Sequence, residues 1–258
     1  MAAPLAASLA ALRAELAAWG LDADAVFAKS AYDAAAPSHA LPPAGDLQDS
    51  ACVLVGSGAA LFGAVAANLA EGAPGSLELP AAPVDAHVEA GVAAAAAAAE
   101  AASCGALPAG SSVLRFAHDR RPDRLVAMQR LAAVTGAYRL DQDAMLALHP
   151  AKGQWCALRA AVVLAAPPDA CDELRGGPPP PAAFQLPNAP RPEVAQEHFQ
   201  RAMRGEAGGW LKLREALSPN HPAKYPDEQI AYFYHSDRQA LARRVAAIRR
   251  KAAGAATE

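Results

Sequence analysis

The first residues of the chain carry apolar side chains at the spacing of an amphipathic helix. Leucines and one tryptophan recur every three or four positions, on one face of a helix that Gly20 would end. This stripe consists of Leu5, Leu9, Leu12, Leu16 and Trp19. Further along, the pattern predicts a second, short helix from Val26 to Tyr32.

The next apolar segment is too short for a helix and is rich in residues that favour strands. Residues 51–55 read ACVLV and stop at Gly56, which predicts a buried strand. Residues 58–72 return to helical spacing. A long alanine-rich helix is then expected to run to about Ser103, with Asp85 as the residue that caps its N-terminus.

The middle of the chain alternates between strand and helix patterns. Residues 112–117 predict a strand, and residues 123–134 predict a helix that Gly136 ends. Residues 145–149 and 155–165 predict two more strands. Because the connection between them is short and contains Gly153, we expect these two strands to form an antiparallel hairpin.

The last third of the chain begins with a proline-rich stretch. Residues 167–190 include four successive prolines and predict a stiff, extended connector. From Glu193 onwards the pattern is helical, and residues 252–258 are expected to fray. The sequence therefore predicts a single domain over residues 1–251 of the α+β class, with an antiparallel sheet flanked by helices and a helical C-terminal region.

Composition and charge exclude several kinds of partner. The formal net charge of -3 provides no basic surface for nucleic acid and no polybasic patch for a membrane. No apolar run is long enough to span a bilayer. The cysteines show no C-x-x-C spacing, which argues against a zinc ribbon, an iron–sulfur cluster or a disulfide scaffold. That usage favours a reducing compartment, and we expect a cytoplasmic protein.

Arginines are the best candidates for a ligand site. The sequence has neither a G-x-G-x-x-G nor a G-x-x-x-x-G-K-[ST] phosphate loop, and its histidines are scattered. Arg159 lies in the middle of the strand predicted at 155–165, where an unpaired charge is costly to bury. It should therefore reach either a carboxylate or a cleft that binds an anion, and the residues alone leave both open. Guanidinium groups suit carboxylates and phosphates because their donors match these anions in pairs.

Several motifs, in a consistent order, go beyond composition. The segment 148–164, LHPAKGQWCALRAAVVL, resembles the H-P-x-x-G-x-W-x-x-[IL]-R-x-x-V-x-L string of the CblC-type cobalamin-processing family, the methylmalonic aciduria and homocystinuria type C proteins. HDRRP at 118–122, VTGAY at 134–138, LREALSP at 213–219 and YPDEQIAYF at 225–233 resemble further motifs of that family. The resemblance spans nearly the whole chain and implies a nitroreductase-like fold.

The resemblance also implies a function. Proteins of this family bind cobalamin base-off and remove its upper axial ligand, by glutathione-dependent dealkylation or by reductive decyanation with electrons from FMN or FAD. Cobalt is held by the corrin, so no protein metal site is implied. A downstream cobalamin-trafficking protein is an implied partner, and both a monomer and a ligand-dependent homodimer remain open. Two alternatives remain, a non-catalytic cobalamin carrier and a flavin-dependent nitroreductase-like oxidoreductase.

Site residues follow from the resemblance position by position, and no catalytic side chain is among them. Glutathione carboxylates would be held by Arg159, Arg214 and Arg238. The direct match of the third arginine is Ala240, two residues from Arg238. The family's tyrosine-rich run is reduced here to one tyrosine. Cobalamin would contact Val126, Ala127, Met128, Gln129, Tyr138, Arg139, Ala147 and Leu158.

Overall fold

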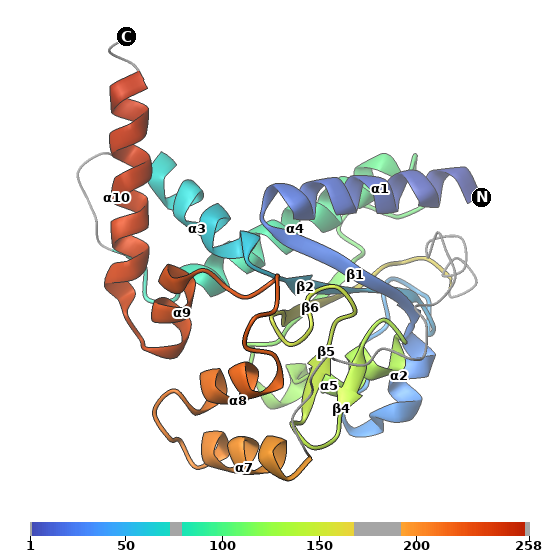
Figure 1. The fold of residues 1–258 in the computed structure, drawn as a ribbon. Coiled ribbons are helices and arrows are strands. Elements are labelled where there is room, and N and C mark those ends of the chain that lie inside the picture. Colours follow the sequence, from blue (N-terminus) through green and yellow to red (C-terminus); the bar gives the residue numbers. More distant parts are fainter. Residues whose placement is uncertain (1, 73–78, 168–191, 256–258) are drawn as a thin grey trace.

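A computed structural model describes residues 2–72, 79–167 and 192–255 (Figure 1). Its centre is a four-stranded antiparallel sheet in the order β1-β2-β6-β3. The strands are β1 (Leu21–Ala28), β2 (Ala51–Ser57), β3 (Val113–Phe116) and β6 (Ala157–Val163). The strand predicted at 51–55 is therefore a central strand, and its residues are all buried, as the unbroken apolar run indicates.

Helices cover both faces of this sheet (Figure 1). On one face lie α1 (Ala2–Ala18), α3 (Ala60–Glu71) and α4 (Pro83–Ala102), whose leucines, valines and alanines pack against Val53 and Val55 of β2. On the other face lie α2 (Lys29–Ala35) and α5 (Met128–Val134), packed against Cys52 and Leu54. Successive residues of β2 thus face opposite cores, as strand geometry requires.

The C-terminal region is helical, as expected. It contains α7 (Pro192–Met203), α8 (Gly209–Leu217), α9 (Asp227–Tyr234) and α10 (Arg238–Ala255). Helix α10 lies beside α3, where Arg249 donates to the carbonyl oxygens of Leu69 and Ala70 at distances of 3.1 and 3.2 Å. Short 3-10 helices occupy Pro37–His39 and Pro122–Arg124. The class predicted from the sequence, α+β with an antiparallel sheet flanked by helices, is confirmed.

The predicted hairpin is wrong. Strand β5 (Leu146–Leu148) pairs with β4 (Arg139–Asp141) in a separate two-stranded sheet, while β6 joins the main sheet. His149 and Gly153 pair through two backbone hydrogen bonds of 2.9 and 2.7 Å and close the turn between β5 and β6. The turn was recognised correctly, but residues 154–156 carry the chain away from β5 before β6 begins.

Local boundaries also differ from those predicted. Residues 26–28 are strand rather than helix, because Val26 and Phe27 pair with Val53 and Cys52 of β2. Asp85 lies within the first turn of α4 rather than at its cap, since α4 already begins at Pro83. Helix α5 starts only at Met128, after the 3-10 turn.

The described helix α10 runs past residue 251, so the fraying expected from 252 does not occur before Ala255. The proline-rich connector, apart from Pro167, and residues 256–258 lie outside the described residues. Within the described ranges, no helix has the length and apolar character needed to cross a membrane.

Two bulges interrupt the sheet next to Val55 of the central strand. In β1, Ala23 pairs with Val55 and Ala25 with Leu54, which leaves Asp24 as the extra residue. In β6, Ala160 pairs with Val55 and Leu158 with Gly56, which leaves Arg159 as the extra residue. Bulges redirect side chains and are common beside functional sites. Both bulges in the main sheet therefore fall on charged residues at the same end of the sheet.

Acidification is expected to destabilise the fold through His87. The Nε2 atom of His87 donates to the carbonyl oxygen of Trp19 at 3.0 Å, and its buried Nδ1 atom has no hydrogen-bond partner among the residues that the structure describes. Burial lowers the pKa of His87, so the unfolded chain binds a proton more readily than the folded protein. The free energy of unfolding should therefore fall as the pH drops below about 6.5.

Urea unfolding at pH 7.5 and 5.5 measures this effect, with His87→Gln as the matched variant. A glutamine can donate to Trp19 but does not titrate, so we expect a smaller loss of stability on acidification. Burial also lowers the pKa of His149, which should leave part of the pH dependence in the variant. An equal loss in both proteins would contradict the role of His87.

Candidate functional site

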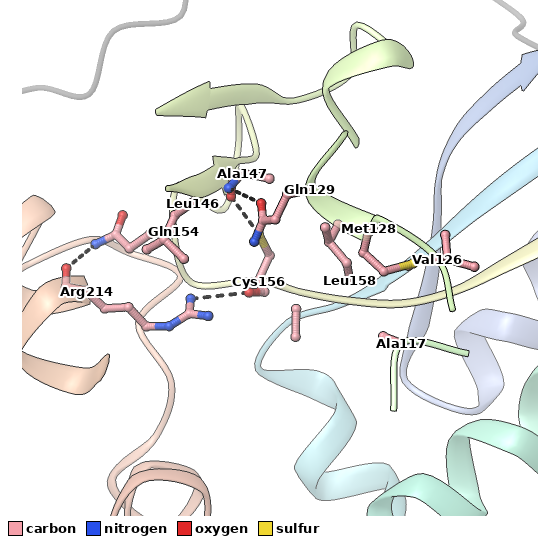
Figure 2. A pocket seen from close by; sticks show the side chains of 11 residues that line it. Ala117, Val126, Met128, Gln129, Leu146, Ala147, Gln154, Cys156, Leu158 and Arg214 are labelled. Atoms are coloured by element: carbon pink, nitrogen blue, oxygen red, sulfur yellow. Dashed lines mark hydrogen bonds between the residues drawn. The ribbon is translucent and has the colours of Figure 1, made fainter. Parts of the chain in front are cut away.

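One pocket lies where α5, β5, the start of β6 and α8 meet, and it has a volume of about 360 Å³ (Figure 2). Arg214 extends toward it from α8, while Val126 and Ala117 lie at the opposite end (Figure 2). The wall is formed mainly by apolar side chains with two amides, one thiol and one guanidinium. Its lining residues are Ala117, Val126, Met128, Gln129, Leu146, Ala147, Gln154, Cys156, Ala157, Leu158 and Arg214.

Most of the residues predicted to contact cobalamin come together here. The structure brings Val126, Met128, Gln129, Ala147 and Leu158 to the same pocket, although they come from three separate segments. The Oε1 atom of Gln129 accepts a hydrogen bond of 2.7 Å from the backbone N–H of Ala147, which holds α5 against β5.

Three of the predicted cobalamin contacts lie elsewhere. The backbone N–H of Ala127 donates to the hydroxyl of Tyr32 at 2.8 Å, and Ala127 does not line the pocket. Arg139 is exposed and lies 3.5 Å from the carboxylate of Asp141. Tyr138 is only 5% exposed, and its hydroxyl donates to the carboxylate of Asp24. The structure therefore gives Tyr138 a different contact from the one expected.

Asp24 is the centre of a buried polar cluster with Tyr138, His149 and Lys152. Its side chain is 3% exposed, and besides Tyr138 it accepts a hydrogen bond of 3.1 Å from Nζ of Lys152. The Nε2 atom of His149 lies 3.6 Å from the same carboxylate. Because Nδ1 of His149 accepts from two backbone N–H groups, the proton of the neutral ring is on Nε2 and faces Asp24.

The charges in this cluster shift the pKa values of its members. Burial would lower the pKa of Lys152, but the carboxylates of Asp24 and Asp22 outweigh burial and raise it. Burial and the charge of Asp24 both raise the pKa of Tyr138. Any Cβ at Gly56 would overlap the carboxylate of Asp24, which explains the glycine at this point of β2. The cluster is compact and fixes the turn 149–153 against β1.

Cys156 and Gln154 connect that turn to the pocket. Burial raises the pKa of the Cys156 thiol to about 11, so it is protonated at neutral pH. Gln154 is 1% exposed, and its Nε2 atom donates to the carbonyl oxygens of Arg214 and Ser218 at 2.6 and 3.2 Å. This contact holds the end of α8 beside the pocket.

The two arginines predicted to bind glutathione lie near one another, and each stacks on a ring of α9. Arg214 donates to the carbonyl oxygen of Cys156 at 3.2 Å and lies 6.0 Å from the centre of the Tyr234 ring. Arg159 donates through Nε to the hydroxyl of Ser57 at 2.8 Å and lies 5.6 Å from the centre of the Phe233 ring. Burial lowers the pKa of Arg159, with smaller effects from its neighbours.

The alternatives that the sequence left open for Arg159 can now be compared. None of the carboxylates in the described part of the chain forms an ion pair with Arg159 or with Arg214. Since a guanidinium stays charged at pH 7, two positive charges lie in a half-buried region without a direct counter-ion. A salt bridge to a described carboxylate is therefore not what holds Arg159 or Arg214 in place.

Arg238 is not part of this arrangement. Its guanidinium donates to the carbonyl oxygens of Leu79, Pro80 and Ala81 at distances of 2.6 to 3.3 Å. It does not line the pocket, and Ala240, the direct match of the family's third arginine, is fully buried in the core. The structure thus offers no support for Arg238 as a glutathione ligand.

Sequence reasoning missed two polar residues of the site. Gln154 occupies a variable position of the H-P-x-x-G-x-W string, and Tyr225 opens the YPDEQIAYF motif. Tyr225 is 5% exposed, and its hydroxyl lies next to the guanidinium of Arg214. The signal that could have found Tyr225 was its place in a motif that also supplies Phe233.

A comparison with solved structures found a protein with a similar fold. The chain superposes on the crystal structure of a C. elegans B12-trafficking protein, CblC, a homologue of human MMACHC, with a TM-score of 0.57. The match covers 92% of this chain and 94% of that chain, at 15% sequence identity. The two proteins share a fold. At this identity the likeness to CblC establishes the architecture, and the chemistry must be argued from the site.

Neither of the two sequence comparisons found a similar protein. No family model matches the chain, and no curated protein is similar to it at a significant level. The shared fold agrees with the fold that the motif resemblance implies.

Proposed function

We propose that the protein binds cobalamin in its base-off form and removes the upper axial ligand. Removal would occur by glutathione-dependent dealkylation, by reductive decyanation, or by both. The observation that carries the proposal is the convergence of Val126, Met128, Gln129, Ala147 and Leu158 on one pocket, with Arg214 at its end. These residues were nominated by their positions in CblC-like motifs.

The shape and chemistry of the pocket fit one side of a cobalamin. Its volume of about 360 Å³ is too small for the whole molecule, so the corrin would lie across the mouth with its upper ligand inside. Met128, Val126 and Leu158 offer an apolar wall to the corrin ring. Since the oxygen of Gln129 is used by Ala147, its amide N–H group remains to donate to the amide rim of the corrin.

The arginines would hold the second reactant. Arg159 and Arg214 suit the carboxylates of glutathione, and holding the thiol beside the corrin makes the reaction effectively unimolecular. In dealkylation the thiolate forms a carbon–sulfur bond, and the cobalt–carbon bond breaks with both electrons left on cobalt. A flavin, as FMN or FAD, would supply the electrons for decyanation. Cys156 is unsuited to replace glutathione, because its thiol is buried and protonated.

The setting of this reaction is also a proposal. Reduced glutathione is abundant in the cytoplasm, which suits this chemistry. The product would pass to a downstream cobalamin-trafficking protein. The protein would act as a monomer or as a homodimer that forms with ligand.

Two rival functions make different predictions. A non-catalytic carrier would bind cobalamin base-off but leave the cobalt–carbon bond intact. A flavin-dependent nitroreductase-like oxidoreductase would retain flavin and ignore cobalamin. Within the described residues Arg159 and Arg214 form no ion pair, which favours the enzyme, since a carrier needs no anionic co-substrate.

Absorbance spectroscopy tests the proposal directly. We expect methylcobalamin to shift to the base-off spectrum when mixed with the protein, and the cobalt–carbon band to disappear after glutathione is added. A shift without this loss would support the carrier or decyanation alone, which cyanocobalamin with reduced flavin would then separate. No shift with any cobalamin would overturn the proposal and favour the flavin enzyme.

A further inference from the structure

His149 holds the turn 149–153 with both its backbone and its ring. Its backbone pairs with Gly153 through two hydrogen bonds of 2.9 and 2.7 Å. Its Nδ1 atom accepts hydrogen bonds from the backbone N–H groups of Ala151 and Lys152 at 3.1 and 3.2 Å. Only the neutral ring can accept these two bonds, because a protonated imidazole is a donor at both nitrogens.

The ring is packed in its place within the turn. It lies edge-on to the ring of Tyr138, with 5.2 Å between the ring centres, and its Nε2 atom lies 3.6 Å from the buried carboxylate of Asp24. A proton on Nδ1 would point at the two backbone N–H groups instead of accepting from them. Both hydrogen bonds must therefore break when the ring becomes charged.

Charged groups from α1, β1 and the turn surround this ring. His149 lines a second pocket of about 370 Å³, together with the charged residues Arg13, Asp22, Asp24 and Lys152. Its side chain is 15% exposed, so solvent protons can reach it. Burial lowers the pKa of His149, and the carboxylates of Asp24 and Asp22 oppose this shift without reversing it, since Lys152 adds to it. The ring is therefore neutral at pH 7 and takes up a proton below about pH 6.5.

The same turn leads directly into one wall of the pocket in Figure 2. Gln154 and Cys156 follow the turn, and both line that pocket. The thiol of Cys156 donates to the carbonyl oxygen of Gly153 at 3.5 Å, and the Nε2 atom of Gln154 donates to the carbonyl oxygen of Arg214 at 2.6 Å. A turn that opens therefore displaces part of the pocket wall and loosens its contact with α8.

We propose that His149 is a positioning residue for cobalamin binding. Its neutral ring keeps the pocket wall in place, and a proton on the ring weakens the binding. This inference rests on the proposed function, because it takes the ligand of the pocket to be cobalamin. Protonation removes two hydrogen bonds that the closed turn needs, so the affinity is full at neutral pH and falls as the pH drops below about 6.5.

The Kd for methylcobalamin at pH 7.5 and 5.5, measured from the base-off absorbance change, tests this role. In the unsubstituted protein we expect the Kd to rise about three- to tenfold at pH 5.5, as for the loss of one hydrogen bond or two weak ones. In His149→Asn this rise should disappear, because an asparagine oxygen can accept from the backbone two residues on and does not titrate. His149→Ala offers no acceptor, so its Kd should be raised already at pH 7.5.

His87→Gln is the matched control. Burial lowers the pKa of His87 as well, but His87 contacts Trp19 and does not line the pocket. This variant should therefore keep the full pH dependence of cobalamin binding. Circular dichroism at both pH values verifies that each protein remains folded. A Kd that does not change with pH in the unsubstituted protein, or the same rise in His149→Asn, would overturn the role of His149.

Hydrogen exchange of the backbone amides of Ala151 and Lys152, followed by NMR without cobalamin, is an independent readout. Their protection should fall between pH 7.5 and 5.5 in the unsubstituted protein and stay constant in His149→Asn. Constant protection in the unsubstituted protein would contradict the inference. If methylcobalamin binds at neither pH, the proposed function fails, and the protection of these two amides still decides whether the proton opens the turn.

Discussion

Replacing Lys152 by methionine is expected to lower the free energy of unfolding by about 3 kcal/mol. The carboxylate of Asp24 is 3% exposed and has Lys152 as its direct cationic partner, at 3.1 Å. Methionine keeps the length and apolar stem of the lysine but leaves the carboxylate buried without that charge. The hydroxyl of Tyr138 still donates to Asp24, which holds the loss below that of a fully stripped ion.

Urea unfolding monitored by circular dichroism measures this loss, and Lys212→Met is its control. Lys212 pairs with Glu206 at 2.7 Å, but its side chain is half-exposed, so its loss should cost less than about 1 kcal/mol. The double variant Asp24→Asn with Lys152→Met should recover part of the stability, because no buried charge is then left unpaired. Equal losses of unfolding free energy in Lys152→Met and Lys212→Met would show that the buried ion pair stabilises the fold no more than the exposed one.

The elements that local pattern determines were predicted well. The leucine stripe of α1, the apolar run of β2 and the alanine-rich α4 each carry their own period, so their place could be inferred without knowing the rest of the chain. The pairing of the strands could not be predicted in this way, because it depends on segments that lie far apart in the sequence. Residues 26–28 join β1 only because β2 lies beside them, and β5 pairs backwards with β4 rather than forwards with β6.

The residues of the site also divide into those that were predicted from the sequence and those that were not. Met128 and Leu158, both assigned by the motif resemblance, line the pocket. Tyr138 does not line the pocket, and its hydroxyl donates to the carboxylate of Asp24. Asp24 matches no motif, and it contacts residues more than a hundred positions away along the chain. Its place in the polar cluster therefore could not be predicted from a local sequence pattern.

The two bulges explain why charged residues sit at this end of an otherwise apolar sheet. A regular β1 or β6 would keep strict alternation, and Asp24 or Arg159 would then fall on a face already filled by a hydrophobic core. The extra residue in each strand turns the charged side chain out of that alternation. One bulge brings Asp24 to Lys152, and the other brings Arg159 to the ring of Phe233.

The variant Arg159→Gln is expected to reduce kcat/KM for glutathione-dependent dealkylation ten- to hundredfold. A neutral amide cannot hold a carboxylate as a guanidinium does, and the difference of about 1.5–3 kcal/mol is typical of a hydrogen bond to a charged group. The loss should appear mainly in KM for glutathione, because Arg159 would hold the carboxylate equally in the ground state and the transition state. Base-off binding of methylcobalamin should persist, since Arg159 does not line the pocket.

Single-turnover loss of the cobalt–carbon band at several glutathione concentrations measures the effect. Arg115→Gln is the matched control: Arg115 is a half-buried strand arginine of β3, opposite Ala161 of β6, and its guanidinium donates to the carbonyl oxygen of Leu114. Arg159→Lys keeps the charge but not the paired donors, so its rate should lie between those of the wild type and Arg159→Gln. Wild-type kinetics in Arg159→Gln would show that Arg159 does not hold the glutathione carboxylate. A variant that no longer shifts methylcobalamin to the base-off spectrum would instead mean that this arginine supports the corrin face, because only the cobalamin step would then have been lost.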